Sequence, residues 1–239
     1  MKILIAGSSS GIGKAIAEKM LSENHSVIGL ARNHQKFIPD SKSYSTHTID
    51  FAEINLLEQQ FKQIQQKETD VDVIVCSVGY GDFAELEQFS VKRMQNIFNV
   101  NFLSQTILIK TFLPELKRKK FGKIILMGSE CALEGEKKGT MYCATKFALR
   151  GFAQSLRKEC ASSHVTVTLI NPGIVKTPFF DDLSFHPAQG ILHSIEADQI
   201  AKLVSMLIAE EHNCVYEEIN LQPMKKMIER RSVECFPTK

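Results

Sequence analysis

Gly7-Ser8-Ser9-Ser10-Gly11-Ile12-Gly13 stands between an apolar run, Lys2–Ala6, and a helix-type run, Ile12–Ser22. Glycines at this spacing let the chain turn sharply and let backbone N–H groups approach a pyrophosphate at a helix N-terminus. A nucleotide-hydrolase loop needs Gly-Lys followed by Ser or Thr, whereas Lys14 precedes Ala15, so that class of site is excluded. A tight packing turn explains only one of the glycines. The stretch therefore predicts a dinucleotide-binding turn with the contacts Gly7, Ser9, Ser10, Gly11, Ile12 and Gly13.

Strand-type and helix-type runs alternate along the whole chain. The strand-type runs are Lys2–Ala6, Ser26–Ala31, Ser45–Asp50, Val71–Cys76, Lys123–Gly128, Val165–Ile170 and Cys214–Asn220. The helix-type runs are Ile12–Ser22, Ile54–Lys67, Lys92–Leu113, Met141–Ser162 and Ala197–Glu210. Several strand runs are almost continuously apolar, which is typical of parallel strands covered on both faces. The alternation predicts an α/β protein: a three-layer, doubly wound Rossmann fold with a parallel sheet of about seven strands flanked by helices.

Length and composition limit the domain count. The chain has 239 residues and no Pro/Gly/Ser-rich linker, so one domain over residues 1–239 is expected. The longest stretch without a clear element is Asn171–Ile195. Loops of that length are usually functional lids or mobile segments.

Charge and hydropathy exclude several classes of protein. The fractions of 44% hydrophobic and 23% charged residues exclude disorder, and a net charge of +2 argues against a nucleic-acid partner. No apolar run approaches the roughly 20 residues that cross a bilayer, and the first residues lack a signal-peptide core. A cytoplasmic protein without a membrane partner is therefore expected.

The cysteines and histidines do not form a metal-site pattern. Six cysteines occur without a Cys-x-x-Cys pair, so they are expected to be small core residues rather than zinc ligands or disulfides. His186 and His193 are seven residues apart and lack metal-type neighbours. No metal site is predicted.

The end of the second strand bears on the choice of cofactor. Dinucleotide folds that prefer NAD place an acidic residue there, which accepts a hydrogen bond from the ribose 2′-hydroxyl. Here the sequence reads Leu30-Ala31-Arg32-Asn33. A guanidinium pairs with a 2′-phosphate, and no carboxylate repels one. NADP is therefore favoured over NAD, with Arg32 and Asn33 as contacts, although a solvated surface arginine is the plainer alternative.

Three side chains suggest proton chemistry. Tyr142 and Lys146 lie one turn apart on one predicted helix, and Ser129 follows the fifth strand, where ligands sit in open α/β sheets. Lowering a tyrosine pKa from about 10 to near neutrality takes roughly 4 kcal/mol of preference for the phenolate. One cation at about 4 Å in a partly shielded site supplies about that much. We expect Lys146, helped by the positive ring of a nicotinamide, to lower the pKa of Tyr142, although surface packing and helix capping are the ordinary roles of such residues.

Taken together, Gly7-x3-Gly11-x-Gly13, Ser129, Tyr142-x3-Lys146 and Asn171-Pro172-Gly173 resemble the short-chain dehydrogenase/reductase family. The resemblance runs from residue 2 to about residue 222. It implies that Tyr142 is the catalytic acid/base, that Ser129 polarises the substrate carbonyl, and that Lys146 also holds the nicotinamide ribose. It further implies a proton relay supported by Asn101, and cofactor contacts from Asp50, Phe51, Pro172, Gly173, Ile174 and Thr177. Asp50 could instead simply end a strand, and Asn101 could be an exposed polar residue of a helix.

One departure from the family pattern affects the fourth strand. Cys76-Ser77-Val78-Gly79 stands where the family has Asn-Asn-Ala-Gly, which puts the rigidity of the central sheet in question. Ser77 and Gly79 are still expected to contact the cofactor through their backbone.

The same resemblance bears on substrate and assembly. It implies a substrate lid around residues 176–195, with Tyr80, Phe83, Glu130 and Cys131 near the pocket, and a homodimer or homotetramer through the helices 92–113 and 141–162. The aromatic residues of the lid either favour an apolar substrate or dock the lid on the core.

The sequence thus predicts an NADP-dependent oxidoreductase that moves hydride between nicotinamide and a small carbonyl or secondary-alcohol substrate. An isomerase or dehydratase of the extended relatives would need a larger substrate domain. A non-enzymatic NADP sensor or scaffold would need only the glycine turn and Arg32, so the set Ser129, Tyr142 and Lys146 argues against it.

Overall fold

A seven-stranded parallel sheet forms the centre of the part of the chain that the computed structural model describes, residues 1–210 and 214–231. Its strand order is β10-β6-β5-β4-β1-β2-β3. The strands are β1 (Lys2–Ala6), β2 (Ser26–Ala31), β3 (Tyr44–Thr48), β4 (Val73–Cys76), β5 (Gly122–Met127), β6 (Val165–Pro172) and β10 (Glu218–Leu221). The strand order reverses between β1 and β4, which is the arrangement of doubly wound dinucleotide folds. The predicted fold class is confirmed.

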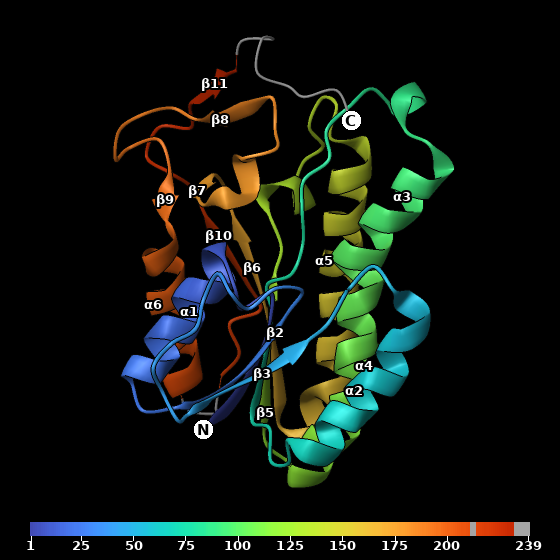
Figure 1. Ribbon diagram of the computed structural model, residues 1–239, viewed down its shortest axis with the longest axis vertical. Coiled ribbons are helices and arrows are strands. Elements are labelled where there is room, and N and C mark those ends of the chain that lie inside the picture. Colours follow the sequence, from blue (N-terminus) through green and yellow to red (C-terminus); the bar gives the residue numbers. More distant parts are fainter. Residues whose placement is uncertain (211–213, 232–239) are drawn as a thin grey trace.

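Helices cover both faces of this sheet (Figure 1). One face carries α1 (Gly11–Ser22) and α6 (Ala197–Ala209), and the other carries α2 (Ile54–Lys67), α4 (Ser104–Lys119) and α5 (Thr140–Cys160). Strand side chains alternate between the faces, so Ile3 and Ile5 fill one core whereas Leu4 and Ala6 fill the other. This double burial explains the continuous apolar runs of the sequence.

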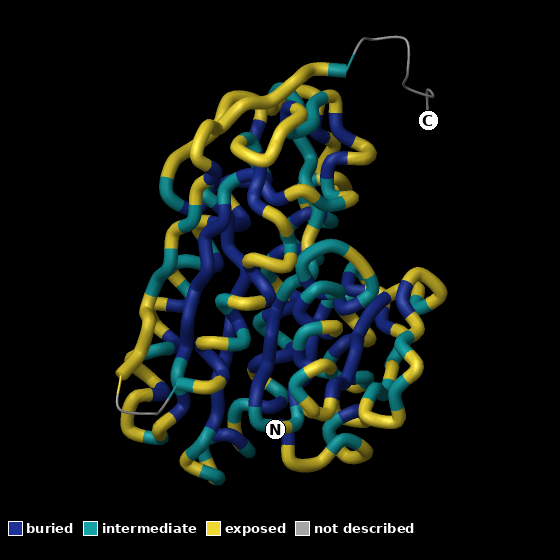
Figure 2. The backbone as a smooth tube through the Cα atoms, turned by 90° about the vertical axis from the view of Figure 1, so that its left-hand side faces the viewer, coloured by how far each residue is buried: buried dark blue, intermediate teal, exposed yellow. Residues whose placement is uncertain are grey.

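The carboxyl ends of the parallel strands meet along one edge of the sheet. The glycine turn follows β1 there, Arg32 follows β2, Ser77 follows β4 and Ser129 lies just after β5. In Figure 2 the buried residues run through the middle of the molecule, and exposed residues dominate its outer loops. The fold therefore gathers segments that are far apart in the sequence at one edge.

The expected elements and the observed ones agree closely in most places. Lys2–Ala6, Ser26–Ala31 and Ile54–Lys67 match to the residue, and Ser45–Asp50 begins and ends one or two residues earlier. The last strand, expected at 214–220, is observed as β10, Glu218–Leu221, and the carbonyl oxygen of Glu217 before it accepts the N–H of Leu169 at 3.1 Å. Residues 211–213 lie outside the described residues.

The helix expected over 92–113 is wrong as a single regular helix. The structure has α3 (Val91–Phe98), a π-helical turn over Asn99–Leu103, and then α4. Hydrophobic periodicity could not show this, because a π turn inserts one residue per turn without ending the helix. Such turns occur frequently at functional sites.

The stretch 171–195 contains more structure than the sequence indicated. β6 continues to Pro172, and β7 (Val175–Lys176) pairs in parallel with β9 (Ile195–Glu196). β8 (Phe185–Pro187) pairs antiparallel with β11 (Ile228–Arg230) near the C-terminal end. The partner of β8 is about forty residues away along the chain, so local sequence patterns do not reveal it.

The cysteine prediction is correct for the four residues Cys76, Cys131, Cys143 and Cys160, which are buried and free. It is wrong for Cys214, which is exposed. Cys235 lies outside the described residues. No helix in the described part of the chain has the length and apolar character needed to span a membrane.

Candidate active site

The glycine turn packs too closely for side chains at two of its positions. Gly7 has a φ of +85°, and a Cβ there would lie 2.9 Å from the backbone nitrogen of Val78. A Cβ at Gly13 would lie 2.1 Å from the carbonyl oxygen of Gly7. Gly13 thus allows α1 to begin directly against the end of β1, and Gly7 allows the turn to approach the end of β4.

A cavity of about 180 Å³ opens beside this turn, between the ends of β1, β2 and β4. It is lined by Gly7, Ser9, Ser10, Ala31, Arg32, Asn33, Lys36, Phe51, Ser77, Val78 and Gly79. Arg32 and Lys36 are both exposed cations, and no carboxylate is among these lining residues. The lining combines closely approaching backbone with two positive charges, which is the chemistry that suits a phosphorylated ribose.

Eight predicted cofactor contacts line this cavity, and the other residues of the glycine turn flank it. Asp50 does not line it: its carboxylate accepts a hydrogen bond from the backbone N–H of Ala52 at 3.0 Å, which is a turn contact after β3. Phe51, next to it, is buried and does line the cavity. Lys36 was not predicted as a cofactor contact. Its position four residues after Arg32 could have indicated a second cation at the same site.

The predicted chemical residues converge at the end of β5. Ser129, Tyr142 and Lys146 are all buried, and the Ser129 side chain neighbours the Tyr142 hydroxyl. The Lys146 ammonium lies 5.7 Å from the centroid of the Tyr142 ring and donates to the carbonyl oxygen of Met127 at 2.9 Å. The helix α5 supplies two of the three groups, as the spacing of four residues required.

The Lys146 ammonium by itself does not lower the pKa of Tyr142, so that part of the expectation is wrong. Burial raises the pKa of Tyr142 above its ordinary value, and the neighbouring Ser129 hydroxyl opposes that rise only in part. Burial also lowers the pKa of Lys146 to about 8. The reason is that the low-polarity surroundings disfavour both charges, while the Lys146 ammonium points at the Met127 carbonyl. Tyr142 is therefore a neutral phenol at neutral pH and can act as a proton donor.

Asn101 lies within the π turn and is completely buried. Its side chain exchanges two hydrogen bonds with the backbone of Tyr80, accepting from N–H at 3.0 Å and donating to C=O at 2.9 Å. It also donates to the Thr145 hydroxyl at 3.3 Å. A Cβ at Gly79 would lie 3.2 Å from the Asn101 amide oxygen and 3.9 Å from the Lys146 ammonium. The side chains of Asn101 and Lys146 therefore both lie close to Gly79, and Asn101 is not an exposed polar residue.

Aromatic rings cover the Tyr142 phenol. The ring centroids of Phe83 and Phe179 lie 5.3 Å and 5.8 Å from that of Tyr142. Phe185 of β8 packs against Phe83, and Phe180 packs against Phe179. The segment 177–187 thus closes over the chemical residues.

The segment after β6 runs alongside the glycine turn. A Cβ at Gly11 would come within 3.4 Å of the Thr177 side chain. Pro172 and Ile174 are buried, and the Gly173 N–H donates to the carbonyl oxygen of Leu221 at 2.8 Å. The segment 172–177, which contains the predicted contacts, therefore lies beside the glycine turn at the carboxyl-end edge of the sheet.

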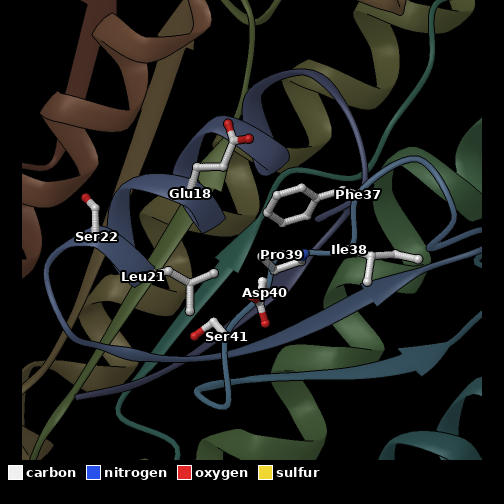
Figure 3. A pocket seen from close by; sticks show the side chains of 8 residues that line it. All are labelled: Glu18, Leu21, Ser22, Phe37, Ile38, Pro39, Asp40 and Ser41. Atoms are coloured by element: carbon white, nitrogen blue, oxygen red, sulfur yellow. The ribbon is translucent and has the colours of Figure 1, made fainter.

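A second, larger hollow of about 570 Å³ lies between α1 and the loop that follows β2 (Figure 3). It is lined by Glu18, Leu21, Ser22, Phe37, Ile38, Pro39, Asp40 and Ser41. None of the predicted site residues lines it, and its size alone does not make it a chemical site.

Comparison with known proteins decides the family. A model of the family described as short chain dehydrogenase matches residues 1–187, most of the chain. The chain belongs to the short-chain dehydrogenase family. It is therefore an oxidoreductase by family, as the sequence predicted.

Relatives over nearly the whole chain agree with this membership. An uncharacterized oxidoreductase of Staphylococcus epidermidis is 28% identical over 225 residues, which cover 92% of this chain and 96% of the relative. A 3-oxoacyl-[acyl-carrier-protein] reductase of Haemophilus influenzae is 30% identical over 222 residues, which cover 87% of this chain and 90% of the relative. The solved alcohol dehydrogenase of the archaeon Thermococcus sibiricus, complexed with 5-hydroxy-NADP, superposes on this chain with a TM-score of 0.81 at 24% identity. The match covers 95% of this chain and 98% of the archaeal chain. That structure shows the shared fold of this short-chain dehydrogenase.

Proposed function

We propose that this short-chain dehydrogenase is an NADP-dependent reductase acting on a small carbonyl substrate, or in reverse on a secondary alcohol. The observation that carries the proposal is the buried cluster of Ser129, Tyr142 and Lys146 beside a cavity with two cations. A sensor or scaffold would need the cavity but not the buried hydroxyl pair, so it is not favoured.

The described residues fit NADP. Backbone of the glycine turn would hold the pyrophosphate, and Arg32 with Lys36 would pair with the 2′-phosphate, which NAD lacks. Ser77 and Gly79 would add backbone contacts, and the segment 172–177 would lie along the nicotinamide. Two solved proteins of the same fold hold NADP or an NADP derivative, which is consistent with this choice.

The reduced cofactor, when bound, supplies a hydride to the carbonyl carbon. Tyr142 donates its phenolic proton to the carbonyl oxygen as the alcohol forms, since burial keeps that phenol protonated at neutral pH. Ser129 donates a hydrogen bond to the same oxygen and stabilises the negative charge that develops there. Lys146 holds positive charge beneath the Tyr142 ring and favours the phenolate left behind. Asn101 fixes the Tyr80 and Thr145 segments around Lys146, and in the family's relay the proton returns from solvent past this residue.

The two cations that line the cavity allow the preference for NADP over NAD to be tested. We expect Arg32→Ala combined with Lys36→Ala to weaken NADPH binding by about 10- to 100-fold, because two charge-assisted contacts to phosphate are lost. NADH binding should change less than threefold, since NADH has no 2′-phosphate. Fluorescence titration of both cofactors measures this.

Lys42→Ala is the matched control, because Lys42 is exposed in the same region but does not line the cavity. Equal losses for NADPH and NADH in the double variant, or no loss for either, would contradict the assignment.

We also propose a lid over residues 176–195 and assembly into a homo-oligomer. Phe179 of the lid already packs against Tyr142, and Phe180 packs against Phe179, so substrate entry requires this segment to move. Leu103 and Phe147 are exposed apolar side chains on the predicted interface helices, 39% and 43% exposed. Sedimentation at micromolar concentration tests the assembly, and a monomer would contradict it.

A further inference from the structure

A buried amide lies directly beneath Ser129. Asn171 is completely buried at the end of β6, and its amide oxygen accepts the backbone N–H of Ser129 at 3.3 Å. A Cβ at Gly128 would come within 2.0 Å of that same oxygen. The lack of a side chain at Gly128 therefore admits the amide that holds the Ser129 backbone.

The other end of the amide fixes its orientation. The Asn171 NH₂ group donates to the Glu218 carboxylate at 2.9 Å and to the amide oxygen of Asn220 at 3.0 Å. Both acceptors lie on β10, which pairs with β6. A flipped amide would face the Glu218 carboxylate with its oxygen and the Ser129 N–H with its NH₂ group, losing all three bonds.

An arginine anchors the carboxylate in turn. Arg150 of α5 lies 3.1 Å from the Glu218 carboxylate and also donates to the carbonyl oxygen of Ala132 at 3.4 Å. Ala132 ends the short helical turn that begins just after Ser129, and the N–H of Cys131 in that turn donates to the Ser129 hydroxyl at 3.2 Å. The network thus holds the Ser129 segment at its N–H and again at the turn that contacts its hydroxyl.

We propose that Asn171, Glu218 and Arg150 are positioning residues for the Ser129 hydroxyl. None of the three is a predicted substrate or cofactor contact, and each acts through the backbone of the segment 129–132. The proposal rests on the proposed function, in which Ser129 donates to the carbonyl oxygen. A displacement of such a donor by about 1 Å is enough to cost up to roughly 100-fold in rate. The expected signature is therefore a loss in kcat with little change in KM.

The test variant is Glu218→Gln. Its side chain keeps its size, but one end becomes an NH₂ group that must face either the Arg150 guanidinium or the Asn171 NH₂ group. We expect kcat to fall about 10-fold with KM and the NADPH Kd changing less than twofold. In a Ser129→Ala background, which itself loses about 100-fold in kcat, Glu218→Gln should cost nothing further, because the hydroxyl that it positions is gone.

Glu217→Gln is the matched control. Glu217 is the preceding residue and forms a comparable ion pair with Arg157 at 3.3 Å, but its side chain is 68% exposed and it is not in the network. It should leave kcat unchanged. Should Glu218→Gln fail to fold, Arg150→Lys provides the same test, since it keeps the charge but lacks the fork that reaches both Glu218 and Ala132.

A readout without turnover separates this proposal from the proposed function. The amide proton of Ser129 should shift in the NMR spectrum and exchange faster in Glu218→Gln than in wild type, whatever the enzyme's substrate. An unchanged Ser129 amide, an unchanged kcat, or an equal loss of kcat in the Ser129→Ala background would overturn the positioning role. A shifted amide in a protein that reduces no carbonyl would instead contradict only the proposed function.

Discussion

Replacing Tyr142 by Phe is expected to lower kcat by about 10²- to 10⁴-fold, the range that a positioned proton donor contributes. The substitution removes only the phenolic oxygen, and the ring would keep its contacts with Phe83 and Phe179. NADPH binding should therefore change less than threefold. Steady-state rates with NADPH and a carbonyl substrate, together with cofactor titration, measure both quantities.

Tyr216→Phe is the control for this variant. Tyr216 is 39% exposed, lies before β10 and does not line the cofactor cavity. Its kcat should stay within twofold of wild type. If Tyr142→Phe kept turnover, or if both variants lost activity equally, Tyr142 would not be the proton donor.

Lys146→Met is expected to separate activity from stability. Turnover should fall about 10²-fold, because the variant loses the charge that favours the Tyr142 phenolate. Stability at pH 7 should instead rise by about 1–3 kcal/mol. Burial lowers the pKa of Lys146 from 10.5 to about 8, so burying the ammonium costs the folded state about 3 kcal/mol, which the lost bond to Met127 offsets in part.

The stability difference between wild type and Lys146→Met should depend on pH. Between pH 8 and 10.5 the unfolded chain binds a proton at Lys146 that the folded chain does not, so wild-type stability gains a contribution that increases through this window. The variant lacks that gain, and its stability advantage should shrink above pH 8. Wild-type turnover should decline as pH rises through about 8, where the ammonium is lost. Urea unfolding at several pH values and a pH–rate profile measure the two trends.

Lys123→Met serves as the comparison. Lys123 is also buried with a lowered pKa, but its ammonium donates to the carbonyl oxygens of Leu207 and Glu210 at the end of α6, far along the sheet from Tyr142. It should retain full turnover. Loss of turnover in both lysine variants, or a less stable Lys146→Met at pH 7, would contradict the role given to Lys146.

Much of the fold could be predicted because its determinants are local. Apolar runs such as Ile3–Ala6 specify strands covered on both faces, and the glycine turn specifies where the first helix begins. The substitution of Cys76 and Ser77 for the family's asparagines raised doubt about the central sheet, yet Cys76 remains paired with both Ala6 and Leu126. Sheet pairing depends on backbone and burial, which those side chains do not alter.

The features that the sequence did not reveal depend on tertiary contacts. The π turn at Asn99–Leu103 is an irregularity within a continuous helical pattern, and the pairing of β8 with β11 joins distant segments. The raised pKa of Tyr142 follows from the depth of burial, which a spacing of four residues cannot report. Asn171 was noticed only as part of a motif, and its bond to Ser129 appears only once β6 lies beside β5.

We propose above all that this chain moves a hydride from NADPH to a carbonyl carbon. The most direct test incubates the protein with NADPH deuterated at the nicotinamide C4 and a panel of aldehydes, ketones and 3-oxoacyl thioesters, followed by mass spectrometry of the products. We expect at least one substrate to yield an alcohol carrying one deuterium on the former carbonyl carbon, at a rate that Tyr142→Phe abolishes. Tight NADPH binding with no deuterated alcohol anywhere in the panel would contradict the claim and favour a binding role.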